Sequence, residues 1–211
     1  MSIFDSPKFK ELLKDRRDWV DVNNRENNQF DLTSLLSNLY SDSSHFIFEL
    51  LQNAEDAKAK HVKFTLTSEE FRLWHDGDDF TYDDIKSITS INKSTKTADF
   101  TKIGEHGVGF KSVLALTKSP IINSGGIKFE INDIVYPNII STNSNGDKTE
   151  IILPFNREDL QERDVLQVVS NIYNRLKNLS FRNILFLNNI QKIDWVFEGD
   201  NGRYTKVTQN N

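Results

Sequence analysis

The chain has 211 residues, of which 37% are hydrophobic and 27% charged, as expected for a soluble globular protein with one core of ordinary size. Its lack of cysteine excludes a disulfide framework and a thiolate metal site, and favours a cytoplasmic location. The sequence predicts neither a signal peptide nor a membrane span. The net charge of −5 argues against nucleic acid as the main partner.

Helix signals recur along the chain as capping residues followed by apolar positions at three- and four-residue spacing. They predict helices over residues 7–17, 32–39, 45–59 and 82–88 and within 157–178. The expected inner side of the last helix carries Leu160, Val165, Leu166, Val169, Ile172 and Leu176. The polar stretch 18–29 predicts a loop or strap. We therefore expect an N-terminal helix and strap over 1–30 and the main domain over 31–211.

Strand signals appear as alternation of apolar and polar residues. They predict strands over 62–66, 71–75, 119–123, 127–131 and 149–153, with Asn145-Gly146 as the turn before the last of these. The end of the chain, from Ile193 to Val207, predicts a hairpin that turns between Gly199 and Gly202.

A polar stripe interrupts the helix expected over 45–59. Glu49, Asn53 and Asp56 follow one another at i, i+4 and i+7, so a helix places an acid, an amide and a second acid on one face. Burial of such a stripe costs free energy unless a ligand, a metal or water satisfies it. The stripe therefore predicts a binding site for a polar ligand.

About 50 residues later, a glycine-rich segment precedes the apolar run 113–116. Gly104, Gly107 and Gly109 predict a loop that enters a helix N-terminus, where free backbone N–H groups suit an oligophosphate. A P-loop fits poorly, because Phe110 precedes the lysine and a polar stretch takes the place of the upstream strand. A dinucleotide fingerprint fails because Ser112 occupies its third glycine position.

These two motifs, in order, resemble the conserved boxes of the GHKL ATPases, which include Hsp90, MutL, type II topoisomerases, histidine kinases and MORC proteins. The segments ELLQNAEDAKA (49–59), INKSTK (91–96) and IGEHGVGFKSV (103–113) are most similar to the Hsp90-like domains of sacsin and related proteins. The resemblance extends from about residue 33 to 155. It implies a two-layer α/β sandwich, the Bergerat fold, with a mixed, mostly antiparallel sheet and helices on one face.

The resemblance also implies roles in binding Mg²⁺ and ATP. Glu49 corresponds to the general base that activates the attacking water, and Asn53 to the Mg²⁺ ligand, with Asp56 supporting them and Ala57 beside the nucleotide. The phosphates are assigned to Gly104, Glu105, Gly107, Val108, Gly109, Phe110 and Lys111, and to Lys96 from the polar stretch 90–102. That stretch is expected to be a nucleotide lid, with a plain surface loop as the alternative.

The base-binding segment departs from the family pattern D-x-G-x-G. Here His75-Asp76-Gly77-Asp78-Asp79 places a histidine at the first position, so either neutral His75 accepts a hydrogen bond from the base or a backbone shift brings Asp76 there. A third interpretation is that this segment forms a turn with a purely structural role. Thr149 resembles the strand threonine that closes the adenine pocket, although an ordinary strand residue would look the same.

The expected function is Mg²⁺-dependent binding and slow hydrolysis of ATP to ADP, with lid closure and association of two protomers on ATP binding. The alternative is a module that senses ATP or ADP without hydrolysing it. A histidine kinase is disfavoured because no phosphoacceptor-helix region is recognisable. The sequence points to the nucleotide-binding part of a larger protein or to a stand-alone module, and it does not indicate a protein client.

Overall fold

The computed structural model describes residues 3–25, 44–90, 109–142, 148–157, 162–179 and 187–206. The helices are the 3-10 helix η1 (Ile3–Asp5), α1 (Pro7–Arg25), α3 (Phe46–Asp56), α4 (Tyr82–Ile88), the 3-10 helix η3 (Gly109–Ala115) and α5 (Glu162–Lys177). The strands are β1 (His61–Leu66), β2 (Glu70–His75), β3 (Ile121–Ser124), β4 (Ile127–Asn132), β5 (Tyr136–Ser141), β6 (Thr149–Pro154), β7 (Lys192–Phe197) and β8 (Asp200–Thr205).

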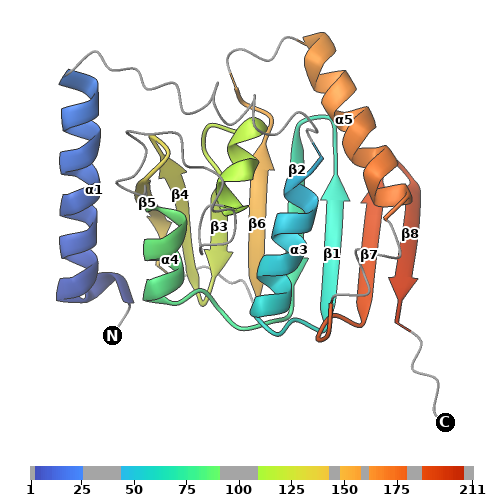
Figure 1. Cartoon of the computed structure of the whole chain (residues 1–211), viewed down its shortest axis with the longest axis horizontal. Helices are drawn as coiled ribbons and strands as arrows, with labels where there is room; N and C mark the ends of the chain where they lie inside the picture. Colours follow the sequence, from blue (N-terminus) through green and yellow to red (C-terminus); the bar gives the residue numbers. More distant parts are fainter. Residues whose placement is uncertain are drawn as a thin grey trace.

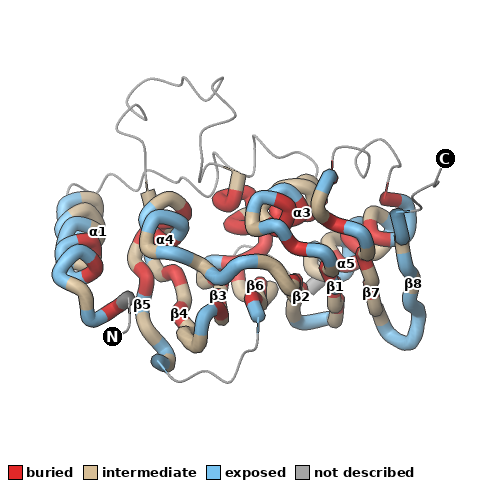
Figure 2. The backbone as a smooth tube through the Cα atoms, turned by 90° about the horizontal axis from the view of Figure 1, so that it is seen from below, coloured by how far each residue is buried: buried red, intermediate tan, exposed pale blue. Residues whose placement is uncertain are grey.

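All of these strands form one sheet in the order β5-β4-β3-β6-β2-β1-β7-β8. Strand β1 pairs parallel with β7, and the other neighbouring strands pair antiparallel. The helices lie together on one face of the sheet, while α1 stands beside the edge strand β5 (Figures 1 and 2). The structure therefore confirms the predicted two-layer α/β sandwich with a mixed, mostly antiparallel sheet.

Alternating side chains of the central strands produce the two layers. Val62, Phe64 and Leu66 of β1 are buried under the helices, whereas Lys63 between them is exposed on the other face. The ring of Phe46 in α3 meets the ring of Phe71 in β2 edge to face, with 5.0 Å between centroids. Burial of each such aromatic side chain contributes roughly 1.5–3 kcal/mol, so the apolar face of α3 fixes the helix on the sheet.

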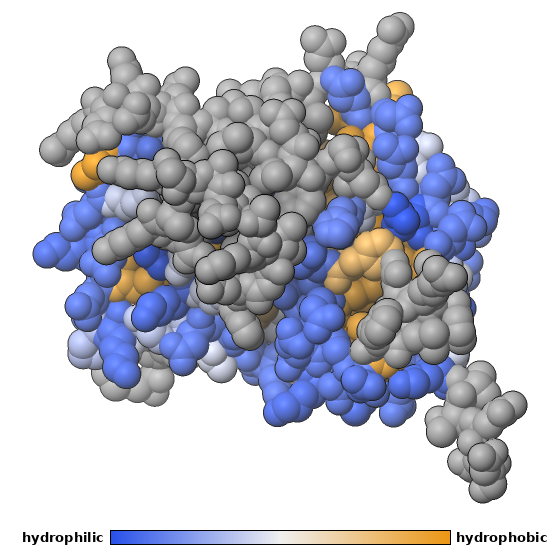
Figure 3. Space-filling model, in the orientation of Figure 1, coloured by the Kyte–Doolittle hydropathy of each residue, from blue (hydrophilic) through white to orange (hydrophobic). Residues whose placement is uncertain are grey.

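The described part of the helix-bearing face is mainly hydrophilic at its surface, with apolar side chains visible only in small patches (Figure 3). Among the described residues, no helix is both long and apolar enough to cross a membrane.

Some elements differ from the sequence prediction. Helix α1 continues to Arg25, through residues expected to be a loop, because polar side chains do not interrupt a helix whose inner side is apolar. Strand β5 was not predicted, because Pro137 and Asn138 are uncommon in strands and β5 is an edge strand, where such residues are tolerated. In α5, Leu166 is 65% exposed rather than facing inward, whereas Val169, Ile172 and Leu176 are buried as expected. The predicted helix 32–39, Leu160, the Asn145-Gly146 turn and Val207 lie outside the described residues.

Helix α1 shares the core of the main domain. Its Phe9 and Leu12 are buried, and Phe9 contacts Phe4, whose ring lies 6.2 Å from that of Phe129 in β4. At its middle, Arg16 donates to the carbonyl of Lys86 and the hydroxyls of Thr89 and Ser90 at the end of α4. The first helix is therefore packed against the sheet, and the expected boundary at residue 30 falls outside the described residues.

Glu55 fastens the C-terminal half of α3 to the segment that enters β7. Glu55 is 6% exposed, and its carboxylate accepts from the backbone N–H groups of Asn188 (2.7 Å), Asn189 (2.6 Å) and Ile190 (3.0 Å). Burial alone would raise the pKa of this carboxyl, but the hydrogen bonds from Ile190, Asn189 and Asn188 outweigh it and leave the pKa lowered. A buried anion surrounded by donors holds the helix in one position.

We predict that Glu55→Gln destabilises the fold by about 2–3 kcal/mol at neutral pH, because an amide N–H₂ then faces backbone donors. A carboxyl with a lowered pKa stabilises the fold above its ordinary pKa of 4.5, and this contribution is lost as the pH falls through the lower, folded-state value. Denaturant unfolding should therefore show the gap between wild type and variant narrowing as the pH falls below 4.5. Asp56→Asn, at the exposed neighbouring acid, is the matched control and should change stability by less than about 0.5 kcal/mol. Equal stability of Glu55→Gln and wild type would contradict this role.

Candidate functional site

Helix α3 presents Glu49 and Asn53 one turn apart on the side that meets the start of η3. Both are half-buried, and the side chain of Asn53 makes no hydrogen bond within the described residues. His45, which the sequence reading left out, lies one turn before Glu49, with Nε2 3.3 Å from Glu49 Oε1. A carboxylate, an amide and an imidazole thus line one edge of the helix.

Gly109, the first residue of η3, lies against the Glu49 carboxylate. A Cβ added at Gly109 would collide with the carboxylate of Glu49, so the observed position of this carboxylate depends on the glycine. Residues 109–115 form a 3-10 helix rather than the expected α-helix, and Ser112 Oγ donates to the Gly109 carbonyl at 2.7 Å. Phe110 is buried beneath the segment. Gly109, at the end of the glycine-rich segment, therefore lies against Glu49 of the polar stripe in α3.

A second polar group lies near the other end of α3, on the helix-covered face of the sheet. His75 on β2 and Thr149 on β6 are direct partners across two antiparallel strands, and both are buried. Thr149 Oγ1 lies 2.6 Å from Ser124 Oγ, which accepts from the Phe80 N–H and reaches Asp79 Oδ1 at 3.4 Å. This second polar group thus consists of a buried imidazole and two buried hydroxyls, with the Asp79 carboxylate beside them.

The protonation of His75 follows from its contacts. Its Nδ1 accepts a hydrogen bond from the backbone N–H of Gly77 at 3.2 Å, so Nδ1 carries no proton. Burial lowers the pKa of His75 to about 4, although Asp76 and Asp79 act in the opposite direction. The ring is therefore neutral near pH 7, with its proton on Nε2. This differs from the prediction that neutral His75 accepts from the base, because the only free ring nitrogen is a donor.

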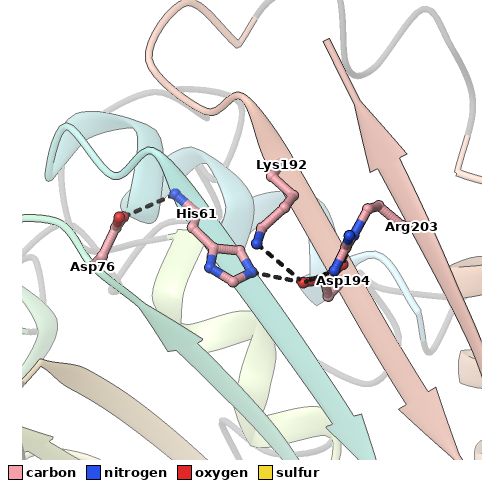
Figure 4. Close-up of polar contacts among 5 residues, drawn as sticks. All are labelled: His61, Asp76, Lys192, Asp194 and Arg203. Atoms are coloured by element: carbon pink, nitrogen blue, oxygen red, sulfur yellow. Dashed lines mark hydrogen bonds and ion pairs between the residues drawn. The ribbon is translucent and has the colours of Figure 1, made fainter.

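Asp76 has a structural partner instead. Its Oδ1 accepts from the backbone N–H groups of Lys60 and His61, both at 2.8 Å, and so holds the start of β1. Figure 4 shows the bond to His61. Gly77, directly after it, packs against the Ala57 carbonyl at the end of α3 with no room for a side chain. The small residues Ala57 and Gly77 join α3 to the turn that follows β2.

Asp56 does not join Glu49 and Asn53. It is exposed, and its Oδ1 accepts from Gln52 Nε2 at 3.0 Å. The acid that α3 buries is Glu55, which the sequence reading passed over because a single buried acid at one helix position leaves no periodic signal. Of the three residues in the predicted polar stripe, only Glu49 and Asn53 therefore lie on the side of α3 that faces η3.

Lys111 points away from the polar edge of α3. Its buried Nζ donates to the carbonyls of Ile88 (3.0 Å), at the end of α4, and of Ile134 (3.4 Å), between β4 and β5. Burial, with a smaller effect from Arg16, lowers the pKa of Lys111 to about 7. A phosphate role is therefore not supported for Lys111, because its donors already hold backbone acceptors.

Several predicted site residues lie outside the described residues, so their placement stays a prediction: Lys96, Gly104, Glu105, Gly107 and Val108. Almost all of the predicted lid, residues 91–102, lies there as well.

The described residues fit a magnesium site of one specific kind. No group of three or more His, Cys, Asp or Glu side chains in this part of the chain could hold a metal by itself. The free amide oxygen of Asn53 fits a Mg²⁺ that takes its other ligands from phosphates and water.

The face of the sheet opposite the helices carries a separate charged network. Asp194 on β7 contacts Arg203, His61 (2.8 Å) and Lys192 (3.6 Å) (Figure 4). The hydrogen bond from Arg203, more than that from His61, lowers the pKa of Asp194 to about 2. This carboxylate stays ionised and paired, so the network reads as cross-strand stabilisation rather than acid–base chemistry.

Comparisons with known proteins agree with the motifs. Residues 72–164 match the model of the Sacsin domain family. A stretch of 109 residues is 38% identical to Protein NO VEIN of Arabidopsis thaliana, covering 48% of this chain and 4% of that protein. A stretch of 105 residues is 32% identical to Sacsin of Homo sapiens, covering 42% of this chain and 2% of that protein. The central part of the chain is therefore similar to sacsin-type domains and spans a very small share of these relatives.

The fold also resembles a solved structure, described as the N terminal domain of a DNA repair protein. The TM-score is 0.57 at 15% sequence identity, over 83% of this chain and 55% of that chain. At this identity the likeness concerns the fold alone.

The contact between Gly109 and Glu49 is testable without any ligand. We predict that Gly109→Ala destabilises the fold by about 0.5–1.5 kcal/mol, because the new methyl group forces the half-buried Glu49 side chain into another rotamer. In a Glu49→Ala background the same substitution should cost much less, since the obstacle is gone. Denaturant unfolding of the four proteins in this cycle measures the coupling. Additive effects would mean that Gly109 and Glu49 do not meet.

Lys111 gives a pH-dependent prediction. Its pKa is about 7 in the folded state and ordinarily 10.5, so between these values the unfolded chain binds more protons. The free energy of unfolding of the wild type, relative to Lys111→Met, should therefore rise from about pH 7 to about pH 10. Lys63→Met, which removes an exposed lysine, is the control. Parallel pH profiles of wild type and Lys111→Met would contradict the buried, weakly basic amine.

Proposed function

We propose that the chain binds a nucleoside triphosphate with Mg²⁺, ATP by its resemblance to GHKL proteins, and hydrolyses it slowly. The observation that carries the proposal is the contact of Gly109 with Glu49, which joins the glycine-rich segment to a half-buried carboxylate one turn from Asn53. The second polar group, at His75 and Thr149, lies near the other end of α3. From Glu49 to Ala57 the helix rises by about 12 Å, a length suited to an extended nucleotide.

In this proposal Glu49 is the general base. A carboxylate within hydrogen-bond reach of a water takes its proton as the water attacks the terminal phosphorus, and such a base contributes about 10²–10⁴-fold. His45 Nε2, 3.3 Å from Glu49 Oε1, orients the carboxylate and stabilises its charge. His45 is a positioning residue here, because it acts through Glu49.

Asn53 would hold the magnesium ion through its amide oxygen. Bound there, the ion would neutralise charge on the phosphates and orient them. The free N–H groups at the start of η3 add donors on the phosphate side. The match of residues 72–164 to the Sacsin domain family supports the part of this assignment at η3, since that range includes η3 but neither Glu49 nor Asn53. We further propose that nucleotide binding drives association of two protomers.

The second candidate is a nucleotide-sensing module that binds ATP or ADP without hydrolysis. The histidine in place of the base-reading acid favours it, because the base end of the site departs from the pattern of the hydrolysing relatives. Both candidates require nucleotide binding, and they differ in whether Glu49 has a catalytic role.

Glu49→Gln separates the two candidates. The amide keeps the shape of the side chain but cannot take a proton, so ATP affinity should be retained while turnover at saturating ATP falls by about 10²-fold or more. Affinity comes from titration calorimetry with Mg²⁺, and turnover from phosphate release on the same preparation. Glu69→Gln, at an exposed acid between β1 and β2, is the charge-matched control and should hydrolyse like wild type.

Equal turnover of wild type and Glu49→Gln would remove Glu49 from the mechanism. Tight ATP binding with no turnover in either protein would support the sensing module.

A further inference from the structure

We propose that helix α1 regulates the phosphate side of the candidate site, because Arg16 and Arg17 of α1 hold the same two segments that the buried Lys111 of η3 holds. These segments are the C-terminal end of α4, residues 86–90, and the turn from β4 into β5, residues 133–136. Docked α1 fixes them and thereby η3, and release of α1 loosens η3 and weakens nucleotide binding. The inference rests on the proposed function and assigns how its site is regulated.

Arg16 attaches α1 to the end of α4. Its Nη2 donates to the carbonyl of Lys86 at 3.3 Å and to Ser90 Oγ at 3.1 Å, and its Nε donates to Thr89 Oγ1 at 3.4 Å. Thr89 is completely buried, so the guanidinium reaches the inside of the helix layer. The last carbonyls of a helix have no partner within the helix, and a cation placed there satisfies them. Arg16 therefore holds α4 at the point where α4 ends.

Lys111 holds the same helix end from η3. Its buried Nζ donates to the carbonyl of Ile88 at 3.0 Å, and Ile88 lies between the residues that bind Arg16. Burial chiefly, and in addition the charge of Arg16, lower the pKa of Lys111, so the two cations are close enough to interact. The two side chains share the carbonyl end of α4, so movement of this helix end changes the contacts of both.

The turn into β5 is the second shared segment. Arg17 Nη2 donates to the hydroxyl of Tyr136 at 2.6 Å, and its guanidinium lies over the Tyr136 ring, 5.4 Å from the centroid. Two residues earlier, the carbonyl of Ile134 accepts from Lys111 Nζ at 3.4 Å. The φ angles of Asp133 (48°) and Ile134 (72°) are left-handed, which strains a β-branched residue such as isoleucine. Such a turn persists only while its neighbours hold it, and Lys111 and Arg17 supply two of these contacts.

The second half of α1 is the part that can separate from the domain. Helix α1 is the outermost helix, beside the edge strand β5 and next to α4 (Figures 1 and 2). Its buried side chains, Phe9 and Leu12, lie in its first half. Residues 16–23, all of which the structure describes, include no buried side chain, and Val22 is 54% exposed. A segment with few buried apolar contacts opens at low free energy, so its polar contacts decide whether it is docked.

The short helix η3 carries the effect to the site. Lys111 lies two residues after Gly109, which lies against the Glu49 carboxylate. Ser112 Oγ donates to the Gly109 carbonyl at 2.7 Å, and all of these η3 residues belong to one 3-10 helix of seven residues. Displacement of Lys111 therefore moves Gly109 as well. The N–H groups proposed to bind phosphate are in the same segment, so their alignment depends on how Lys111 is held.

The test compares wild type with the double variant Arg16→Met/Arg17→Met, which keeps the apolar stems and removes the donors. In hydrogen exchange of the nucleotide-free proteins, peptides covering residues 109–117 should exchange about tenfold faster in the variant, the effect expected for the loss of about one hydrogen bond. Peptides of β1 and β7 should exchange as in wild type. In titration calorimetry with Mg²⁺, ATP should bind about three- to tenfold more weakly to the variant. Lys10→Met/Lys14→Met, at two exposed cations of α1, is the matched control and should behave like wild type.

A second background locates the effect. In Lys111→Met the link to η3 is already cut, so the Arg16 and Arg17 substitutions should lower ATP affinity no further. The same further loss in this background overturns the inference, as does unchanged exchange of residues 109–117 in the α1 variant, a result that does not depend on the folding of Lys111→Met. Equal acceleration of exchange in β1 and β7 also overturns it, because the effect would then be global. Absence of ATP binding by wild type would overturn the proposed function, whereas faster exchange of η3 would still support its coupling to α1.

Discussion

The position of α3 on the sheet is the constraint on which the candidate site depends. The helix is held by its apolar face, by the carboxylate of Glu55 at the entry to β7, and by the close packing of Gly77 on the Ala57 carbonyl. These contacts leave little freedom for the opposite edge, which carries Glu49 and Asn53. A rigid helix with a polar edge places functional groups more accurately than a loop would.

The half-buried and buried polar residues fall into two groups, one with structural hydrogen bonds and one available to a ligand. Glu55, Asp76 and Lys111 are all hydrogen-bonded to backbone groups, and each has a structural role in the fold. Asn53 and the Nε2 atom of His75 have no such partner among the described residues. Unsatisfied polar groups beside an apolar core are better candidates for ligand binding than the most strongly shifted acids and bases.

The sequence predicted those features that depend on local periodicity and capping. The predicted helix 82–88 is observed as α4, which Thr81 caps together with Asp84, and alternation located β1 and β2. The sequence prediction failed where a tertiary partner decides the outcome. The direction of the Lys111 side chain depends on carbonyl groups 23 residues before and 23 residues after it in the chain. Asp76 accepts hydrogen bonds from backbone groups at the start of β1. The tautomer of His75, likewise, is set by the fold of the turn after β2, which no sequence pattern encodes.

The central claim is that one nucleotide lies along α3, with its phosphates at Gly109 and its base at Thr149. Backbone amide NMR of ¹⁵N-labelled protein, titrated with Mg²⁺ and a non-hydrolysable ATP analogue, tests this most directly. The account predicts that the amides of Gly109 and Asn53 shift together with those of Gly77 and Thr149, along a single binding curve. Shifts confined to one end of α3, or centred on Asp194 and Arg203 on the far face of the sheet, would contradict it.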